Sequence, residues 1–235
     1  MANPQFLLLD SDVLIQCFIA DELRPLRELK KGYGIQPAIV PEVETEIAWT
    51  RNYKDRFDPS LRKAIGNGTV VILDEWTFPT HVGTTILGAA AAGASYASIQ
   101  RLGMHYNQRV QTGEAYTFAT AVSIRQPAAS NDWKAIKTLQ EASLDLPSPV
   151  LRAYDLIVFA FLVGSLDDPD CERFREALLR EKSEFIPQAF RANSFQDGLR
   201  NFTPRLLDAT LALSEVNQAG GTTPSYAVPL SIARQ

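Results

Sequence analysis

Short apolar runs alternate with amphipathic stretches along roughly the first two thirds of the chain. The run Phe6–Leu9 is continuously apolar and stops at Asp10. This pattern is typical of a strand that is buried on both faces of a parallel sheet. Four later segments have the same short, strand-like character: 38–40, 69–73, 127–130 and 149–151.

Helical patterns fill the intervals between these runs. Helical material follows the first run, and Pro41 suits the first position of a helix that reaches Ala48. An Ala-rich helix is expected over 85–102, closing near Gly103, and Thr112 can cap a helix with an apolar stripe at i, i+3, i+4 and i+7. Further helices are expected from 131–132 and over 154–163. Strands that alternate with helices in this way predict an α/β fold, a parallel-sheet α/β/α sandwich.

The character of the chain changes after residue 166. Residues 170–185 form a charged helical pattern, and a second helix is expected over 204–213. The stretch Gly220–Pro224 then breaks all periodicity. We therefore expect a sandwich domain over 1–166, a helical extension over 167–213 and a flexible tail or docking segment over 214–235.

The composition indicates the class of protein but not its function. The 235 residues are 46% apolar and 21% charged, with a net charge of −4, which is ordinary globular material and not a protein coated in basic surface. The two cysteines, Cys17 and Cys171, are far apart in the sequence, so nothing indicates a disulfide framework or a thiolate metal site. No signal peptide or membrane-length apolar run is seen, so we expect a cytoplasmic protein with no membrane partner.

Four acidic residues lie where the predicted strands end or the following helices begin. They are Asp10, Glu46, Glu114 and Asp132, and ligands of open parallel sheets bind beyond the carboxyl ends of the strands. Most can be explained singly, because an acidic residue at a helix N-terminus stabilises the helix by about 0.3–1 kcal/mol. Asp10 is harder to explain, because it ends a buried run next to Asp12. A divalent cation would relieve the repulsion between these two carboxylates.

Four motifs in this order resemble those of PIN-domain nucleases. Residues 7–15 (LLLDSDVLI) resemble the first motif and residues 41–47 (PEVETEI) the second, while Gly113–Ala115 and Ser130–Asp132 resemble the third and fourth. The resemblance covers about residues 5–165. The stretch between Glu46 and Glu114 is longer than in compact members, and the extension from Asp167 lies outside the common core.

The resemblance implies a nuclease that uses Mg²⁺ or Mn²⁺ at a four-carboxylate site, with RNA as the preferred substrate. Asp10, Glu114 and Asp132 would be direct or water-mediated metal ligands, and Glu46 a ligand or a base that positions water. The residues that would support these ligands are Ser11, Asp12 and Asn131. A role as a toxin or defence effector, held by an antitoxin or regulatory protein, is a further expectation, as is a homodimer.

Basic residues around the second motif are candidate phosphate contacts. They are Lys30, Lys31, Arg51 and Lys54, with Arg56, Arg62 and Lys63 nearby. An ordinary solvated surface explains them equally well. We interpret His81 and His105 as structural, and Trp49, Trp76, Trp133 and Tyr116 as packing residues, although Tyr116 is near enough to Glu114 to face a cleft.

Two other functions remain open. Asp10-Ser11-Asp12 also resembles the first motif of haloacid-dehalogenase-like phosphatases, in which Asp10 would be the nucleophile and Asp12 a general acid. Asp167-Asp168 could then stand for that family's late acidic motif, but Leu14 and the lack of a convincing Ser/Thr and Lys pair argue against it. A PIN-like scaffold that binds a partner without catalysis is the third possibility.

Overall fold

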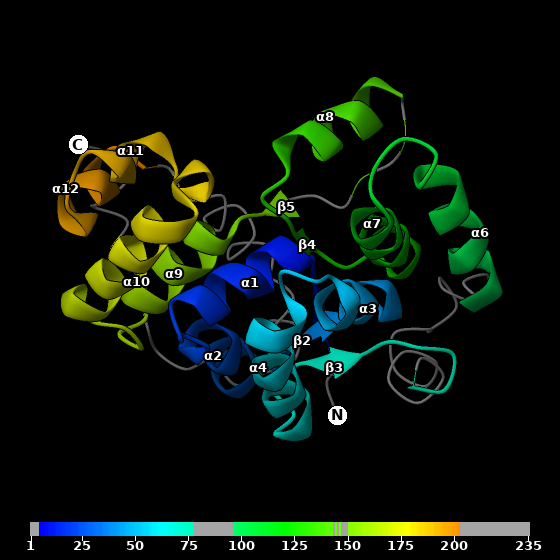
Figure 1. Ribbon diagram of the computed structural model, residues 1–235, viewed down its shortest axis with the longest axis horizontal. Coiled ribbons are helices and arrows are strands. Elements are labelled where there is room, and N and C mark those ends of the chain that lie inside the picture. Colours follow the sequence, from blue (N-terminus) through cyan, green and yellow to red (C-terminus); the bar gives the residue numbers. More distant parts are fainter. Residues whose placement is uncertain (1–4, 78–95, 143, 145, 147–149, 203–235) are drawn as a thin grey trace, which may run out of the picture.

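A computed structural model describes residues 5–77, 96–142, 144, 146 and 150–202 of the chain. Its centre is a five-stranded sheet in which every strand is parallel to its neighbours, in the order β3-β2-β1-β4-β5 (Figure 1). The strands are β1 (Gln5–Leu9), β2 (Ile35–Ile39), β3 (Val71–Ile72), β4 (Ala128–Ala129) and β5 (Val150–Leu151). The expected α/β class and parallel sheet are confirmed.

Helices account for most of the rest of the described chain. They are α1 (Ser11–Ile19), α2 (Arg24–Tyr33), α3 (Pro41–Trp49), α4 (Lys54–Gly66), α6 (Tyr96–Tyr106), α7 (Thr112–Ile124), α8 (Trp133–Glu141), α9 (Ala153–Leu162), α10 (Asp168–Glu181), α11 (Gln188–Arg191) and α12 (Phe195–Arg200), with a 3₁₀ turn η1 (Ser183–Phe185). None of the helices within these ranges has both the length and the apolar character needed to span a membrane.

The central strand explains why the first apolar run has no polar residue. β1 pairs with β2 on one side and with β4 on the other, so that Leu8 is the register partner of both Ala38 and Ala128. Phe6, Leu7, Leu8 and Leu9 are all at most 1% exposed. A strand with helices over both faces must be apolar at successive positions, as the sequence predicted.

Helices cover the sheet on both faces. α2 packs against β2 and α9, whereas α7 packs against β1 and β4 and carries α6 beside it. α3 begins immediately beyond β2 and contacts both α1 and α7. It therefore stands at the carboxyl edge of the sheet between the two helical layers.

The Ala-rich helix differs from its prediction at the end that is described. α6 continues through Gly103 to Tyr106, and residues 85–95 lie outside the described part of the chain. A Cβ atom on Gly103 would stand 2.5 Å from the ring of Tyr116, so this glycine permits close packing on α7 instead of ending the helix. The ring of Tyr116 thus packs against α6, in agreement with the interpretation of Tyr116 as a packing residue.

The extension packs against the sandwich through its own apolar cluster. α10, α11 and α12 place Phe174, Phe190 and Phe195 against Tyr154 and Ile157 of α9, and all five side chains are at most 1% exposed. The charged helix expected from residue 170 is α10 with η1. The helix expected over 204–213 and the tail expected over 214–235 lie outside the described residues.

Three tryptophans are not the packing residues that we predicted. Trp49, Trp76 and Trp133 are 74%, 78% and 56% exposed. Trp49 is the last residue of α3, with the ammonium of Lys54 5.3 Å from the centre of its ring, and Trp133 is the first residue of α8. All three of these large side chains therefore reach the surface. Cys17 and Cys171 are buried and unpaired, as expected.

Candidate active site

The order of the strands brings the first and fourth motifs together. Asp10 directly follows β1 and Ser130 directly follows β4, and these strands are neighbours. The hydroxyl of Ser130 donates a hydrogen bond to Oδ2 of Asp10 at 3.1 Å, and the backbone N–H of Asp132 donates to Oγ of Ser130 at 3.1 Å. Ser130 therefore links two of the predicted site residues across the sheet.

Asp10 is the most deeply buried of these carboxyl groups. It caps α1 by accepting a hydrogen bond from the N–H of Ser11 at 2.8 Å, and it is only 2% exposed. Burial, followed by the charges of Asp12 and Glu46, raises the pKa of Asp10 to about 8. The protein alone therefore disfavours the ionised form of Asp10, and a bound cation would favour it.

Gly113 provides the space in which Glu46 approaches Asp10. A Cβ atom at position 113 would lie 2.6 Å from Oε2 of Glu46 and 3.5 Å from Oδ1 of Asp10. Burial raises the pKa of Glu46, and a hydrogen bond from the Ser11 side chain lowers it in part. The third motif therefore needs glycine at position 113, because any side chain there would displace Glu46.

Glu114 caps a helix, but nearby carboxylates make its charged form less favourable. Its Oε2 accepts a hydrogen bond from the N–H of Gln111 at 3.0 Å, in a capping box at the start of α7. Gln111, and not Thr112 as predicted, is the capping residue. Burial, followed by the charges of Asp10 and Asp132, raises the pKa of Glu114 to about 9. A helix cap alone does not require two further carboxylates nearby, so capping explains only part of this arrangement.

Asp12 and Asp132 complete the cluster. Asp132 caps α8 by accepting a hydrogen bond from the N–H of Ala135 at 2.9 Å. Burial, followed by the charges of Glu46 and Asp132, raises the pKa of Asp12 to about 6. We call the five residues Asp10, Asp12, Glu46, Glu114 and Asp132 the carboxylate cluster. The charges of Glu46 and Asp132 thus act on Asp12, which we predicted only as a supporting residue.

The chemistry of the cluster suits a hydrated hard cation. Within the described ranges, no three Asp, Glu, His or Cys side chains are already close enough to enclose a metal ion, although charge repulsion between the carboxylates raises several of their pKa values. Mg²⁺ keeps several of its waters and is usually held by only one or two carboxylates. The carboxylate oxygens of this cluster are the type of ligand that Mg²⁺ or Mn²⁺ could use.

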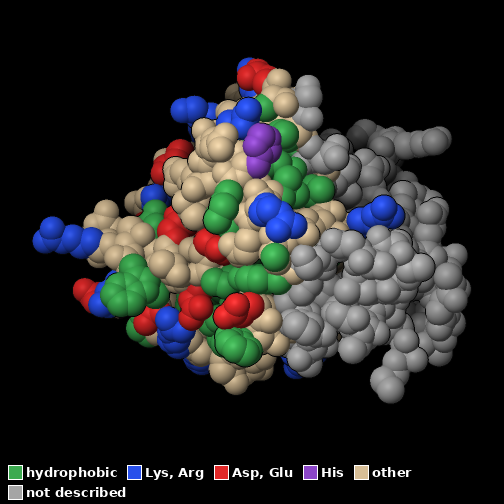
Figure 2. Space-filling view, turned by 90° about the vertical axis from the view of Figure 1, so that its right-hand side faces the viewer, with side chains coloured by type: hydrophobic (Ala, Val, Ile, Leu, Met, Phe, Trp, Pro, Cys, Tyr) green, Lys and Arg blue, Asp and Glu red, His purple; other side chains and the backbone are tan. Residues whose placement is uncertain are grey.

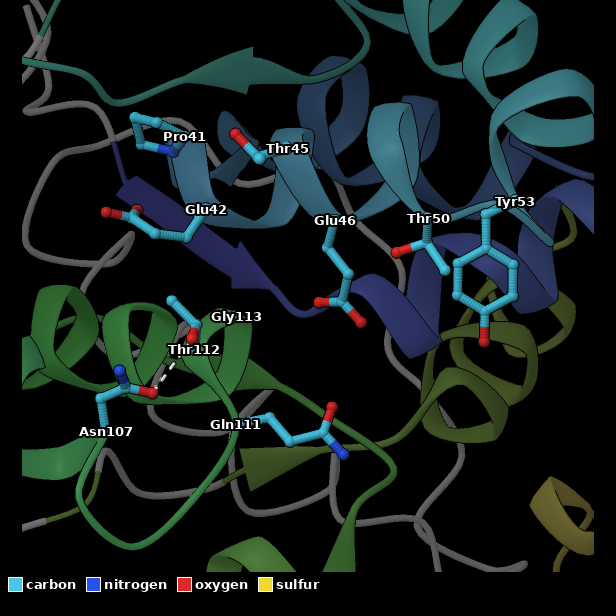
Figure 3. A pocket seen from close by; sticks show the side chains of 10 residues that line it. All are labelled: Pro41, Glu42, Thr45, Glu46, Thr50, Tyr53, Asn107, Gln111, Thr112 and Gly113. Carbon is cyan, nitrogen blue, oxygen red and sulfur yellow. Dashed lines mark hydrogen bonds between the residues drawn. The ribbon is translucent and has the colours of Figure 1, made fainter.

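A cleft of about 740 Å³ leads to Glu46. It is lined by Pro41, Glu42, Thr45, Glu46, Thr50, Tyr53, Asn107, Gln111, Thr112 and Gly113. Figure 3 shows Glu46 extending from α3 toward the side of the cleft where Gln111 lies. Most of the polar groups here are uncharged hydroxyls and amides, which can bind sugar and base groups by hydrogen bonds.

The predicted phosphate contacts are only partly placed near this cleft. Lys30 and Lys31 lie in the last turn of α2, just before β2, and Nζ of Lys30 donates to the carbonyl of Gly68 at 2.6 Å, just before β3. They are therefore at the amino edge of the sheet, opposite the carboxylate cluster, and are not placed to contact a phosphate bound there. Arg51 and Lys54 are next in sequence to the cleft residues Thr50 and Tyr53.

Two other candidate phosphate contacts near the second motif form ion pairs with acidic side chains. Arg62 forms ion pairs with Glu44 and Asp58, and Arg56 pairs with Glu181. On the face that carries α6, Lys and Arg side chains lie singly and not as one basic patch (Figure 2). His105 is exposed on α6, and His81 lies outside the described residues.

Some site residues were not identified from the sequence. Ser130 could have been, because it follows its strand just as Asp10 does. Asn131 has a different contact from the one expected, because its Oδ1 accepts a hydrogen bond from the N–H of Ala153 and so supports the start of α9. Tyr53 gave no chemical signal at all, and only the folded chain places it in the cleft with Glu46.

No family model, no curated protein and no solved structure matched the chain.

Proposed function

We propose that this protein is a nuclease that depends on Mg²⁺ or Mn²⁺ and cleaves phosphodiester bonds at the carboxylate cluster. The observation that carries the proposal is that two buried carboxyl groups, Asp10 and Glu114, lie near the half-buried carboxyl groups of Asp12, Glu46 and Asp132, whose charges together with burial raise the pKa values of Asp10 and Glu114. Burying such groups together costs free energy, and a divalent cation offsets that cost. The Asp10 and Glu114 pKa values of about 8 and about 9 support a site built to bind a cation.

The residues have separate tasks in such a reaction. Asp10, Glu114 and Asp132 would hold the ion directly or through its waters, and the bound ion would supply an acidified water and neutralise charge on the phosphorus oxygens. Glu46 lines the cleft and has a raised pKa. It is therefore suited to orient the attacking water and accept its proton. Ser11 and Ser130 fix the carboxylates by hydrogen bonds.

Single-stranded RNA is the substrate that we propose. The preference for RNA comes from the resemblance to PIN-domain nucleases. The preference for single strands is supported by Trp133, which follows Asp132 and is 56% exposed. An unpaired base can stack on an exposed indole ring, whereas a base inside a duplex cannot.

The phosphatase alternative is weakened by the position of its second acidic motif. Asp167 caps α10 through the N–H of Asp170, at 2.8 Å. It therefore begins a helix of 14 residues, and such a helix is about 20 Å long. Lys182, whose charge lowers the pKa of Asp12, follows the other end of that helix. The late acidic motif is thus far from the carboxylate cluster, and the convergence of Glu114 and Asp132 would have no explanation.

The test is cleavage of single-stranded RNA and DNA by the purified protein with Mg²⁺, with Mn²⁺ and with EDTA. We expect cutting of RNA that needs the metal and falls by at least about 100-fold in Asp10→Asn and in Glu114→Gln. Asp55→Asn, an exposed acidic residue on α4, is the matched control and should cut normally. Hydrolysis of a small phosphate ester without cutting of either polymer would instead establish the phosphatase.

A further inference from the structure

The face of α3 that lines the cleft continues beyond Glu46 to an exposed tryptophan. Glu42, Thr45 and Glu46 line the cleft. Trp49 is the last residue of α3, and these four residues stand at positions i, i+3, i+4 and i+7 of the helix. Residues at such spacings share one side of a helix, so Trp49 belongs to the cleft face. Its Cα–Cβ bond is tilted toward the start of α3 and hence toward Glu46.

The chain that follows Trp49 stays at the cleft. Thr50 and Tyr53 line it, and Figure 3 shows Glu46, Thr50 and Tyr53 in succession along one wall. Trp49 is 74% exposed, so it stands at the rim of the cleft and not within it. A single exposed apolar side chain is common on protein surfaces, so the case for a binding site depends on what surrounds this ring.

Two basic side chains accompany Trp49 at the rim. Nζ of Lys54 lies 5.3 Å from the centre of the indole ring, and Arg51 is two positions after Trp49 in the connection between α3 and α4. Both are exposed, and neither forms an ion pair with an acidic side chain in the part of the chain that the structure describes. Arg56 and Arg62, further along α4, are both paired. The cations nearest to Trp49 are therefore the ones left available for an anion.

We propose that Trp49, Arg51 and Lys54 bind a nucleotide of single-stranded RNA at the rim of the cleft, with the base stacked on the indole ring and the flanking phosphates beside the two cations. The inference rests on the proposed function for its choice of ligand, and it gives the strand a path from the carboxylate cluster past Glu46 and along α3. Proteins that bind single strands combine these two elements, an aromatic ring for a base and basic side chains for the backbone. Lys54 can cover only one face of the ring, so the other face is open to a base.

The experiment measures the affinity for a fluorescent single-stranded RNA oligonucleotide by anisotropy, with Mg²⁺ at several KCl concentrations. The full-length protein carries Asp10→Asn throughout, so that the RNA stays intact. Trp49→Ala removes the ring, and Trp49→Phe keeps an aromatic surface. Trp76→Ala is the matched control, because Trp76 is 78% exposed and follows β3 outside the set of residues that line the cleft.

The two cations are tested in the same assay. Arg51→Gln and Lys54→Gln each remove one charge from the rim of the cleft. Lys31→Gln is their control, because Lys31 is an exposed lysine at the opposite edge of the sheet. Thermal unfolding of every variant reports any structural effect.

We expect the Kd for single-stranded RNA to rise about tenfold in Trp49→Ala, as for the loss of one stacked base, and less in Trp49→Phe. Arg51→Gln and Lys54→Gln should each reduce the slope of log Kd against log salt concentration by about 0.7, the value for one phosphate contact to a single strand. Trp76→Ala and Lys31→Gln should bind as the Asp10→Asn protein does. The unfolding midpoint of Trp49→Ala should change little, because the ring is exposed.

Three results would overturn the inference and leave the nuclease proposal to its own cleavage test. They are unchanged affinity in Trp49→Ala, an equal loss of affinity in Trp76→Ala, and an equal loss for duplex RNA, whose paired bases cannot stack on the ring. Binding that depends on Trp49, in a protein whose wild-type form cuts no nucleic acid with either metal, would uphold this site and refute the nuclease proposal.

Discussion

The buried carboxylate cluster should make the metal-free protein less stable as the pH rises. The pKa of Asp10 is about 8 in the folded protein, against an ordinary value of 3.8. Between these values the unfolded chain releases a proton that the folded protein keeps. The stability associated with Asp10 is therefore fully present below about pH 4 and is lost as the pH rises to about 8.

The size of the effect follows from the shift. One pKa unit corresponds to about 1.4 kcal/mol, so a shift of about four units sets an upper limit of about 6 kcal/mol. Relaxation and water entry at an acidic site reduce this, and we expect about 2 kcal/mol. For a chain of this length that is a change in the unfolding midpoint of about 4–8 °C.

The assay is thermal unfolding in EDTA from pH 5 to pH 9, repeated with Mg²⁺. Asp10→Asn retains the shape of the side chain and cannot ionise, so at pH 8 in EDTA it should unfold about 4–8 °C above the wild type. It should also lose most of the stabilisation by Mg²⁺. The exposed control Asp55→Asn should follow the wild type throughout. If Asp10→Asn and wild type had the same pH dependence, Asp10 would not be buried beside other carboxylates, and the proposed cation site would lose its main support.

Three further outcomes can be measured. Gly113→Ala would place Cβ 2.6 Å from Oε2 of Glu46, so RNA cleavage should fall about 100-fold while the unfolding midpoint changes little; wild-type activity would contradict the steric role of Gly113. Trp133→Ala should weaken binding of single-stranded RNA by about tenfold and leave the unfolding midpoint unchanged, because the ring is 56% exposed; equal loss on duplex RNA would argue against stacking. Gln16 is fully buried, and its amide atoms have no hydrogen-bond partner among the described residues. Gln16→Leu should therefore raise the free energy of unfolding, measured by chemical denaturation, by about 1–2 kcal/mol. A less stable variant would show that the amide has a hydrogen-bond partner.

Local patterns were sufficient for most of the sandwich. The apolar run before Asp10 predicted β1, and Pro41 predicted the start of α3, because both signals depend only on neighbouring residues. We assigned no helix to residues 54–66, where α4 forms. The signal was present, since Phe57, Leu61 and Ala64 are buried at helical spacing. The basic residues of this segment were instead interpreted as phosphate contacts.

The tryptophans and the lysines show where composition and proximity in sequence fail. A tryptophan is a good core residue by size, but Trp49 and Trp133 lie at helix ends that face solvent. Lys30 and Lys31 precede the second motif in sequence and yet lie across the sheet from it, because a parallel strand separates its two ends in space. The direction of β2 in the sheet shows that the lysines and the second motif lie at opposite edges.

The sequence by itself determined that Asp10 would follow a strand, that Glu114 and Asp132 would lie where helices begin, and that Glu46 would lie in the helix after the second strand. That these residues meet was decided by the tertiary structure. The order β3-β2-β1-β4-β5 places Asp10 beside Ser130, and the close approach of α3 and α7 places Glu46 against Gly113. Helix and strand signals are local, whereas the repulsion and burial that define this site arise between segments that only the packed sheet brings together.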